Sequence, residues 1–271
     1  MIVACSFLAC FALFGWPTER GGDRWLRPFL FHPSPYSPND PYAAPPQAKE
    51  VWLRAEDGPL LHAWYYPIQR PKAAVLYLRG NAGNLGDWGP VAQWLGDRQN
   101  VSVLVFDYRG FGRSEGQPSA PGILLDARAA RDWLCLETGL PPEELVYHGY
   151  SLGAALAADL AAETGARLLV MESGFASLPD MAWSILPLLP YRWLIRHPLD
   201  SRAKLTGYHG PLLIYHGAED KVIPAANAQK LFDASPSAQK TLIVQPGLDH
   251  NNMPPPEFDD AYAAWLANRK G

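Results

Sequence analysis

The chain has 271 residues, of which 48% are hydrophobic and 18% are charged, and its formal net charge is −4 at pH 7. This composition excludes a disordered chain, and the length suits either two small domains or one large α/β domain. No run of basic residues occurs, so a nucleic-acid-binding surface is not expected. Only Cys135 lies outside the apolar N-terminal stretch, which leaves no disulfide framework and no zinc-binding cluster in the body of the chain.

Met1–Trp16 form an almost wholly apolar N-terminal segment. It is shorter than the ~20 residues that a membrane-spanning helix needs, and it lacks the basic residues that begin a secretion signal. Arg20, Arg24 and Arg27 follow it instead. A signal anchor, a cleaved signal and a segment shortened by a misassigned start all remain open, with a buried helix as the structural alternative. We expect a protein that is membrane-associated through residues 1–16 or exported, with a cytoplasmic body as the alternative.

Residues 17–49 form a connector that is rich in proline, with seven prolines between Pro28 and Pro46. Proline lacks a backbone N–H and fixes φ, so this segment is expected to be extended rather than helical or part of a central strand. The connector separates the N-terminal segment from residues 50–271, which are predicted to form one folded α/β domain.

From residue 50 onward, strand-like and helix-like segments alternate. Glu50–Arg54 and Leu60–Tyr66 surround an Asp57-Gly58 turn, which predicts a hairpin. Short apolar runs predict further buried strands, at Ala73–Leu78, Val101–Phe106, Leu145–His148, Leu168–Met171, Leu212–Tyr215 and Thr241–Val244. Helices are predicted at Ile123–Thr138, Ser151–Thr164, Ala225–Ala234 and Glu257–Lys270. This alternation favours an α/β protein with a mostly parallel, doubly wound central sheet.

Residues 178–210 interrupt this alternation, because the segment is much longer than an ordinary αβ loop of about 2–6 residues. It contains Met181, Trp183 and Trp193 among many apolar residues and several prolines. We predict a short lid insertion of apolar helices, in which Trp183 and Trp193 bind an apolar acyl chain. The alternative is an ordinary crossover helix with irregular ends.

Two segments match the Gly-x-Ser-x-Gly pattern of a nucleophile elbow, Gly149–Gly153 and Gly112–Gly116. The elbow requires a strand, a sharp turn at the serine and then a helix. An apolar run precedes Ser151 and an alanine-rich helix former follows it, whereas glycines and prolines follow Ser114. We therefore predict that Ser151 is the nucleophile and that Ser114 is a loop residue. An ordinary helix N-cap is the structural alternative for Ser151.

A serine hydroxyl needs an adjacent base, and the base needs a carboxylate that orients it. In this type of sheet the three residues follow one another along the chain in the order serine, acid, histidine. His250, in a loop between the last strand and the last helix, is the predicted base, and Asp220, after the preceding strand, is the predicted acid. Glu172 is the runner-up acid, and His216, at a strand end, is interpreted as a packing residue.

Attack on a carbonyl carbon creates an oxyanion, which needs two preorganised N–H donors. Leu152, directly after the nucleophile, is expected to supply one of them. The loop after Ala73–Leu78 is expected to supply the other, and Asn81 is the best candidate through its backbone N–H. A simple turn of glycine and asparagine is the alternative for this loop.

The chain contains five blocks that together resemble the α/β-hydrolase superfamily, most closely its Bem46-type branch of membrane-associated serine hydrolases: LRGNAGN, FDYRGFGRSEGQP, HGYSLGAALAADLA, LLIYHGAEDKVIP and GLDHNN. The resemblance spans residues 28–268. It implies an α/β-hydrolase fold, catalytic roles for Ser151, Asp220 and His250, and an N-terminal anchor or signal. One departure is Arg79, where the family usually has a histidine that is not the acyl-transfer base. Arg79 is expected to alter the geometry of its loop or to bind an acidic group.

These features predict a serine hydrolase that cleaves carboxylic esters or thioesters through an acyl-enzyme, with neither a metal nor an organic cofactor. The expected partner is a small-molecule ester or lipid-like substrate with an apolar acyl chain. A serine peptidase or an acyltransferase with the same three residues is the alternative. A non-catalytic binding protein is a third hypothesis, which the intact set of three residues disfavours.

Overall fold

The computed structural model describes residues 31–34, 44–185 and 199–267. The predicted N-terminal anchor or signal, residues 1–16, lies outside these ranges and stays a prediction. Within them, every helix is too short or too polar to span a bilayer.

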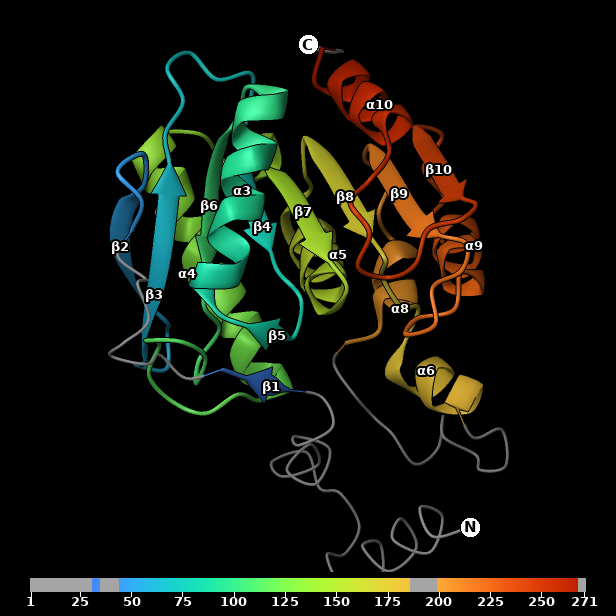
Figure 1. The fold of residues 1–271 in the computed structure, drawn as a ribbon, viewed down its shortest axis with the longest axis horizontal. Coiled ribbons are helices and arrows are strands. Elements are labelled where there is room, and N and C mark those ends of the chain that lie inside the picture. Colours follow the sequence, from blue (N-terminus) through green and yellow to red (C-terminus); the bar gives the residue numbers. More distant parts are fainter. Residues whose placement is uncertain (1–30, 35–43, 186–198, 268–271) are drawn as a thin grey trace, which may run out of the picture.

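A central sheet of eight strands organises the molecule, and its strands lie side by side in the order β10-β9-β8-β7-β4-β6-β3-β2 (Figure 1). The strands are β2 Lys49–Arg54, β3 Leu60–Tyr66, β4 Ala74–Leu78, β6 Ser102–Phe106, β7 Val146–Tyr150, β8 Leu168–Glu172, β9 Leu212–Gly217 and β10 Lys240–Gln245. Strand β3 runs antiparallel to β2 and to β6, whereas the other neighbouring pairs are parallel. The predicted hairpin and the predicted mostly parallel sheet are therefore confirmed.

Helices cover both faces of this sheet (Figure 1). Helices α3 Leu85–Gln99 and α10 Pro256–Ala267 pack on one face, and α4 Ala120–Thr138, α5 Leu152–Thr164, α8 Ser201–Leu205 and α9 Ala226–Ala234 pack on the other. Strand β4 shows the consequence, because Leu76 and Leu78 join the core under α4 and α5 while Val75 and Tyr77 join the core under α3. Burial on both faces explains why these strands are continuous apolar runs rather than alternating ones.

The sequence patterns do not predict helix α3, since Leu85–Gln99 include three glycines and an internal proline. The side chains of Asn84 and Asp87 form a capping box that begins the helix. Gly89 allows the helix to approach the sheet, because a Cβ at this position would lie 2.4 Å from the ring of Trp64. Tertiary packing of small residues therefore outweighs their weak helix propensity.

Short regular elements occur in the connector, which was predicted to be extended, and in residues 178–210, which were predicted to form short apolar helices. In the proline-rich connector, β1 His32–Pro33 pairs in parallel with β5 Ala82–Gly83 in the loop after β4. Residues 178–210 begin with α6 Leu178–Ile185 and include α8 near their end. The middle of this segment lies outside the described ranges, so its role as a lid stays a prediction.

Candidate active site

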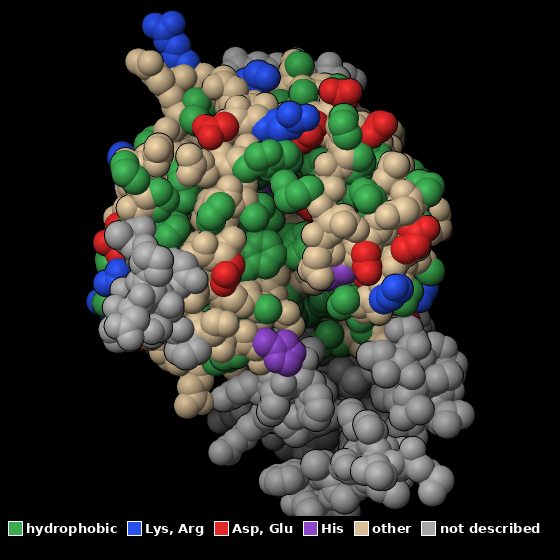
Figure 2. Space-filling view, in the orientation of Figure 1, with side chains coloured by type: hydrophobic (Ala, Val, Ile, Leu, Met, Phe, Trp, Pro, Cys, Tyr) green, Lys and Arg blue, Asp and Glu red, His purple; other side chains and the backbone are tan. Residues whose placement is uncertain are grey.

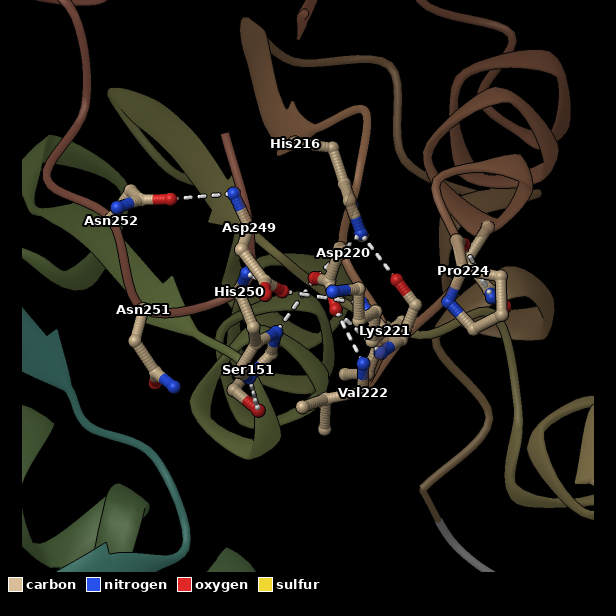
Figure 3. A network of polar contacts seen from close by, with 12 residues as sticks. Ser151, His216, Asp220, Lys221, Val222, Pro224, Asp249, His250, Asn251 and Asn252 are labelled. Atoms are coloured by element: carbon tan, nitrogen blue, oxygen red, sulfur yellow. Dashed lines mark hydrogen bonds and ion pairs between the residues drawn. The ribbon is translucent and has the colours of Figure 1, made fainter. Parts of the chain in front are cut away.

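The predicted site residues come from loops that follow parallel strands. Ser151 follows β7, Asp220 follows β9 and His250 follows β10. Because the carboxyl ends of parallel strands meet at one edge of the sheet, residues that are distant in the sequence converge there. Figure 3 shows the three side chains in one chain of polar contacts.

Ser151 occupies a sharp turn between β7 and α5, with backbone angles of φ 54° and ψ −115°. A positive φ is uncommon for a residue with a side chain and typically marks a constrained functional position. Two glycines allow the turn. A Cβ on Gly149 would lie 2.3 Å from the carbonyl oxygen of Gly153, and a Cβ on Gly153 would lie 1.8 Å from the carbonyl oxygen of Leu78. The elbow is therefore possible only because both flanking positions lack side chains.

His250 lies between the serine and the aspartate. Its Nε2 is 3.2 Å from Oγ of Ser151, and its Nδ1 is 2.7 Å from Oδ2 of Asp220. Since a carboxylate only accepts hydrogen bonds, Nδ1 carries the ring proton and Nε2 presents its lone pair to the hydroxyl. In this tautomer the imidazole can accept the serine proton during an attack on a carbonyl carbon.

The carboxylate of Asp220 is buried and accepts hydrogen bonds on both oxygens. Oδ1 accepts from the backbone N–H groups of Val222 at 2.8 Å and Ile223 at 2.7 Å. Burial by itself raises the pKa of Asp220, but hydrogen bonds from His216, His250 and the backbone outweigh burial and hold the pKa well below its ordinary value. The group is therefore an anion at neutral pH and can stabilise an imidazolium beside it.

His216, interpreted from the sequence as a packing residue, also has a polar role. Its side chain is fully buried, and its Nε2 lies 2.8 Å from the carbonyl oxygen of Ile223 and 3.1 Å from Oδ2 of Asp220. Both neighbours are acceptors, so Nε2 carries a proton that the two oxygens share. His216, near the end of β9, thus helps to fix the position of the Asp220 carboxylate through its contact with Oδ2.

Two further contacts hold the loop that carries His250. Oδ1 of Asp249 accepts from the backbone N–H groups of His250 at 2.7 Å and Lys221 at 3.2 Å, which ties this loop to the loop of the acid (Figure 3). The hydroxyl of Tyr150 donates to the carbonyl oxygen of His250 at 2.8 Å. Sequence reasoning did not identify either contact, although Tyr150 directly precedes the nucleophile and Asp249 directly precedes the base.

The alternative acid and the alternative nucleophile have partners of their own. Oε2 of Glu172 lies 3.1 Å from Nε2 of His148. Ser114 is buried, and its Oγ donates to the carbonyl oxygen of Asp107 at 2.7 Å and accepts from the backbone N–H of His62 at 2.9 Å. Of the candidate acids and nucleophiles, the structure places Ser151 and Asp220 against His250.

The two predicted oxyanion donors lie where β7 and β4 end. Leu152 is the first residue of α5, and Asn81 lies in the loop between β4 and β5. The start of α5 packs against this loop, because a Cβ on Gly153 would contact the backbone of both Leu78 and Arg79. The first N–H groups of a helix have no partner within the helix, so this junction can offer donors to a developing negative charge.

Arg79 is completely buried below the predicted oxyanion loop. Its Nη2 lies 2.9 Å from Oδ1 of Asp107, and its Nη1 donates to the carbonyl oxygens of Gly80 at 3.0 Å and Ala82 at 3.3 Å. Burial raises the pKa of Asp107 to about 6, against the lowering effect of Arg79. The acidic group expected to bind Arg79 is thus internal to the protein, and the arginine holds two carbonyl groups of the loop.

Trp183 belongs to α6, but its side chain, like the whole of Trp193, falls outside the described part of the chain. Over the described ranges, no group of three or more His, Cys, Asp or Glu residues is arranged to hold a metal ion. The groups that the described site offers are a hydroxyl, an imidazole, a carboxylate and backbone N–H donors.

Comparison with known proteins identifies two matching family models. One describes the alpha/beta hydrolase fold and matches residues 73–194, and the other describes serine aminopeptidase, S33, and matches residues 191–254. The two matches together extend from β4 to the loop that carries His250.

Among similar proteins, an uncharacterised protein of Mycobacterium tuberculosis is 36% identical over 209 residues, which cover 76% of this chain and 74% of that protein. An uncharacterised membrane protein of Saccharomyces cerevisiae is 30% identical over 209 residues, 75% of this chain and 74% of that protein. A solved esterase of Pyrococcus furiosus has a TM-score of 0.69, with 89% of this chain and 98% of that chain covered at 20% identity. This last likeness shows a shared fold.

Proposed function

Because this chain belongs to the α/β-hydrolase superfamily, we propose that it is a serine hydrolase that cleaves carboxylic esters or thioesters through an acyl-enzyme. The observation that carries the proposal is the continuous contact from Ser151 Oγ to His250 Nε2, at 3.2 Å, and from His250 Nδ1 to Asp220 Oδ2, at 2.7 Å. A hydroxyl, a base and an orienting carboxylate in this order are what nucleophilic acyl transfer needs.

In the first step, Oγ of Ser151 attacks the carbonyl carbon of the substrate while Nε2 of His250 takes the hydroxyl proton. The imidazolium that forms is stabilised by the Asp220 carboxylate, which stays ionised. The backbone N–H groups of Leu152 and Asn81 are proposed to donate to the carbonyl oxygen as it becomes negative. The tetrahedral intermediate collapses, and His250 returns its proton to the leaving alcohol or thiol.

In the second step, water replaces the leaving group. His250 removes a proton from the water, whose oxygen attacks the acyl carbon, and the same imidazolium then returns the proton to Oγ of Ser151. The products are a free carboxylic acid and the restored enzyme. If an alcohol or amine attacked instead of water, the same residues would catalyse acyl transfer.

An apolar acyl chain is the proposed substrate class. The proposal rests on the apolar sequence of residues 178–210, in which Trp183 and Trp193 are proposed to bind the acyl chain. Each methylene buried there would contribute about 0.8 kcal/mol.

A peptidase is the second candidate, because the serine aminopeptidase model matches residues 191–254, which include Asp220 and His250. The same attack on an amide would require protonation of a poorer leaving group by His250. Comparing an ester, a thioester and an amide of the same acyl group measures which bond this chain cleaves.

We further propose that residues 1–16 associate with a membrane, since a relative at 30% identity is named as a membrane protein. The full chain and a variant that lacks residues 1–16 should partition differently between membrane and aqueous fractions. Equal partitioning would contradict this role of the segment.

Labelling with a fluorophosphonate tests the central proposal, because this reagent traps an activated serine covalently. The full chain should be labelled, and Ser151→Ala should not. A series of p-nitrophenyl esters from acetyl to dodecanoyl then tests the substrate class, with Trp183→Ala and Trp193→Ala as probes of the acyl surface. A flat chain-length profile that neither tryptophan variant changes would remove the apolar-acyl proposal. An unlabelled full chain would support the non-catalytic alternative.

A further inference from the structure

A cavity of about 480 Å³ lies on the α3 and α10 face of the sheet, separate from the serine. Figure 2 views this face and shows apolar side chains gathered around a hollow near its centre. The walls come from α3, from the loop after β4 and from residues 251–254 after the base. The floor is formed by side chains of β4, β7 and β8, among them Tyr77, His148 and Glu172. Neither Ser151 nor Asp220 lines this cavity.

The floor of the cavity carries a buried polar pair that the proposed hydrolysis does not use. His148 is 2% exposed and Glu172 is 6% exposed, and their Nε2 and Oε2 atoms are 3.1 Å apart. A carboxylate oxygen only accepts hydrogen bonds, so the tautomer that fits this contact donates from Nε2 and has Nδ1 as an acceptor. Among the described residues, Nδ1 of His148 has no hydrogen-bond partner. A buried acceptor without a partner is costly, so a molecule in the cavity that donates a hydrogen bond to Nδ1 would be stabilised there.

The walls are aromatic, and the charged side chains among them are acidic. The ring of Trp88 lies 5.3 Å from that of Tyr150 and 6.3 Å from that of Tyr77, measured between centroids. Asp87 joins Glu172 in the lining, and the lining residues within the described part of the chain include no lysine or arginine. Arg98 is not among the lining residues. It lies 5.8 Å from the centroid of the Trp94 ring and forms an ion pair with Asp259. Aromatic faces and carboxylates both attract a cation.

We propose that this cavity binds a small organic ammonium ion, with its N–H groups toward His148 and Glu172 and its apolar body against the aromatic walls. The volume lies within the range of about 300–1,000 Å³ that is typical of small-molecule sites. A primary ammonium satisfies both the unpartnered acceptor and the carboxylate, which an alcohol does less well and an anion does not. Neither Ser151 nor Asp220 takes part in this binding, so the binding proposal does not depend on whether the chain hydrolyses esters.

Three probes of one shape but different charge test the proposal by titration calorimetry on the full chain: phenethylammonium, 2-phenylethanol and 3-phenylpropanoate. The ammonium should bind most tightly and the anion least tightly. Ser151→Ala should bind the ammonium as the unchanged protein does, since the serine does not line the cavity. Equal affinity for the ammonium and the alcohol, tighter binding of the anion, or no saturable binding of the ammonium would each overturn the proposal.

Two variants locate the bound ion. Glu172→Gln should weaken binding of the ammonium by about tenfold or more, while the alcohol should change little, because a hydrogen bond to a charged group is worth about 1.5–3 kcal/mol. Val91→Phe should fill the cavity and abolish binding of both, which keeps the test decisive if Glu172→Gln does not fold. Glu144→Gln, an exposed carboxylate before β7, is the matched control and should bind normally. Unchanged binding in Val91→Phe would place the ion elsewhere and overturn the assignment.

Discussion

The two Gly-x-Ser-x-Gly segments share a sequence pattern but not a structure. In Gly149–Gly153 the serine has the unusual backbone angle, with φ 54°, and the outer glycines leave room for close backbone contact. In Gly112–Gly116 the outer glycines have the unusual angles, with φ 51° and 84°. A positive φ at serine forms the elbow between a strand and a helix, whereas a positive φ at glycine makes a loop turn at low cost.

The partners of the two serines differ in the same way. Ser151 is partly exposed at the strand edge, and its hydroxyl faces the lone pair of an imidazole. Ser114 is buried, and its hydroxyl joins the backbone of Asp107 to that of His62. One hydroxyl therefore has an acceptor that can remove its proton, and the other is used to connect two chain segments. The motif alone therefore specifies a compact turn, and the residues around it specify the chemistry.

The largest expected effect is on the nucleophile. Ser151→Ala should lower kcat by on the order of 10⁴–10⁶, because the three residues act as a unit. Ser114→Ala should keep most of the activity and instead cost about 1–2 kcal/mol of unfolding free energy, since a buried backbone pair loses its partner. Ester hydrolysis and urea unfolding of both variants measure the two effects. Comparable losses of kcat in both variants would reverse the assignment of the motifs.

The acid should have the next largest effect. Asp220→Asn should lower kcat by roughly 10⁴, because an amide favours the wrong tautomer of His250. Glu172→Gln is the matched control, since it also replaces a buried carboxylate by an amide but lies against His148. Measurement of kcat for ester hydrolysis by Asp220→Asn and by Glu172→Gln tests this prediction. A fully active Asp220→Asn protein together with an inactive Glu172→Gln protein would move the acid to Glu172.

Removing Arg79, the buried cation that pairs with Asp107, should destabilise the fold. Arg79→Met leaves the buried carboxylate of Asp107 without its ion-pair partner, which should cost about 3–5 kcal/mol. The double variant Arg79→Met with Asp107→Leu removes both charges and should recover part of the loss. Urea unfolding of the single and double variants gives both values. An unchanged midpoint in Arg79→Met would show that this pair does not support the loop.

A Gly→Ala substitution should cost more stability at Gly153, which is in close backbone contact, than at Gly116, which has a positive φ. Gly153→Ala should cost about 3 kcal/mol or more, because the Cβ meets the backbone of Leu78, which cannot rotate away. Gly116→Ala should cost only about 1–2 kcal/mol, because its Cβ has 3.4 Å to Pro59 and only the positive φ is strained. Thermal or urea unfolding of Gly153→Ala and Gly116→Ala measures the loss of unfolding free energy in each variant. Equal costs would mean that close backbone contact does not distinguish the elbow.

Acid pH should have the smallest and most specific effect. The folded-state pKa of Asp220 lies below its ordinary value of 3.8, so its stabilising contribution is present above that value and is lost as the pH falls through the folded pKa. The difference in unfolding free energy between the unchanged protein and Asp220→Asn should therefore shrink below about pH 4. Asp107, with its pKa raised to about 6, contributes with the opposite sign. A difference that stays constant down to strong acid would contradict the charge-based stabilisation of Asp220.

Much of the fold was predictable because the buried strands are uninterrupted apolar runs. A run such as Ala74–Leu78 is apolar on both faces, so its position and its parallel pairing follow from local composition and from the helices between runs. The order of Ser151, Asp220 and His250 after successive strands likewise predicted their convergence, because loops at the carboxyl ends of parallel strands meet at one edge. For these features, local pattern and chain order are sufficient.

Tertiary structure alone decided helix α3 and the supports of the site. Gly89 reads as a helix breaker until the Trp64 ring is seen to occupy the place of a side chain. The hydrogen bond from Tyr150 to His250, the pairing of Arg79 with Asp107, and the contact between the rings of Tyr77 and His148 join segments far apart in the sequence. No local pattern contains such contacts, since whether a polar side chain is a solvated charge or a buried partner depends on what the rest of the chain places beside it.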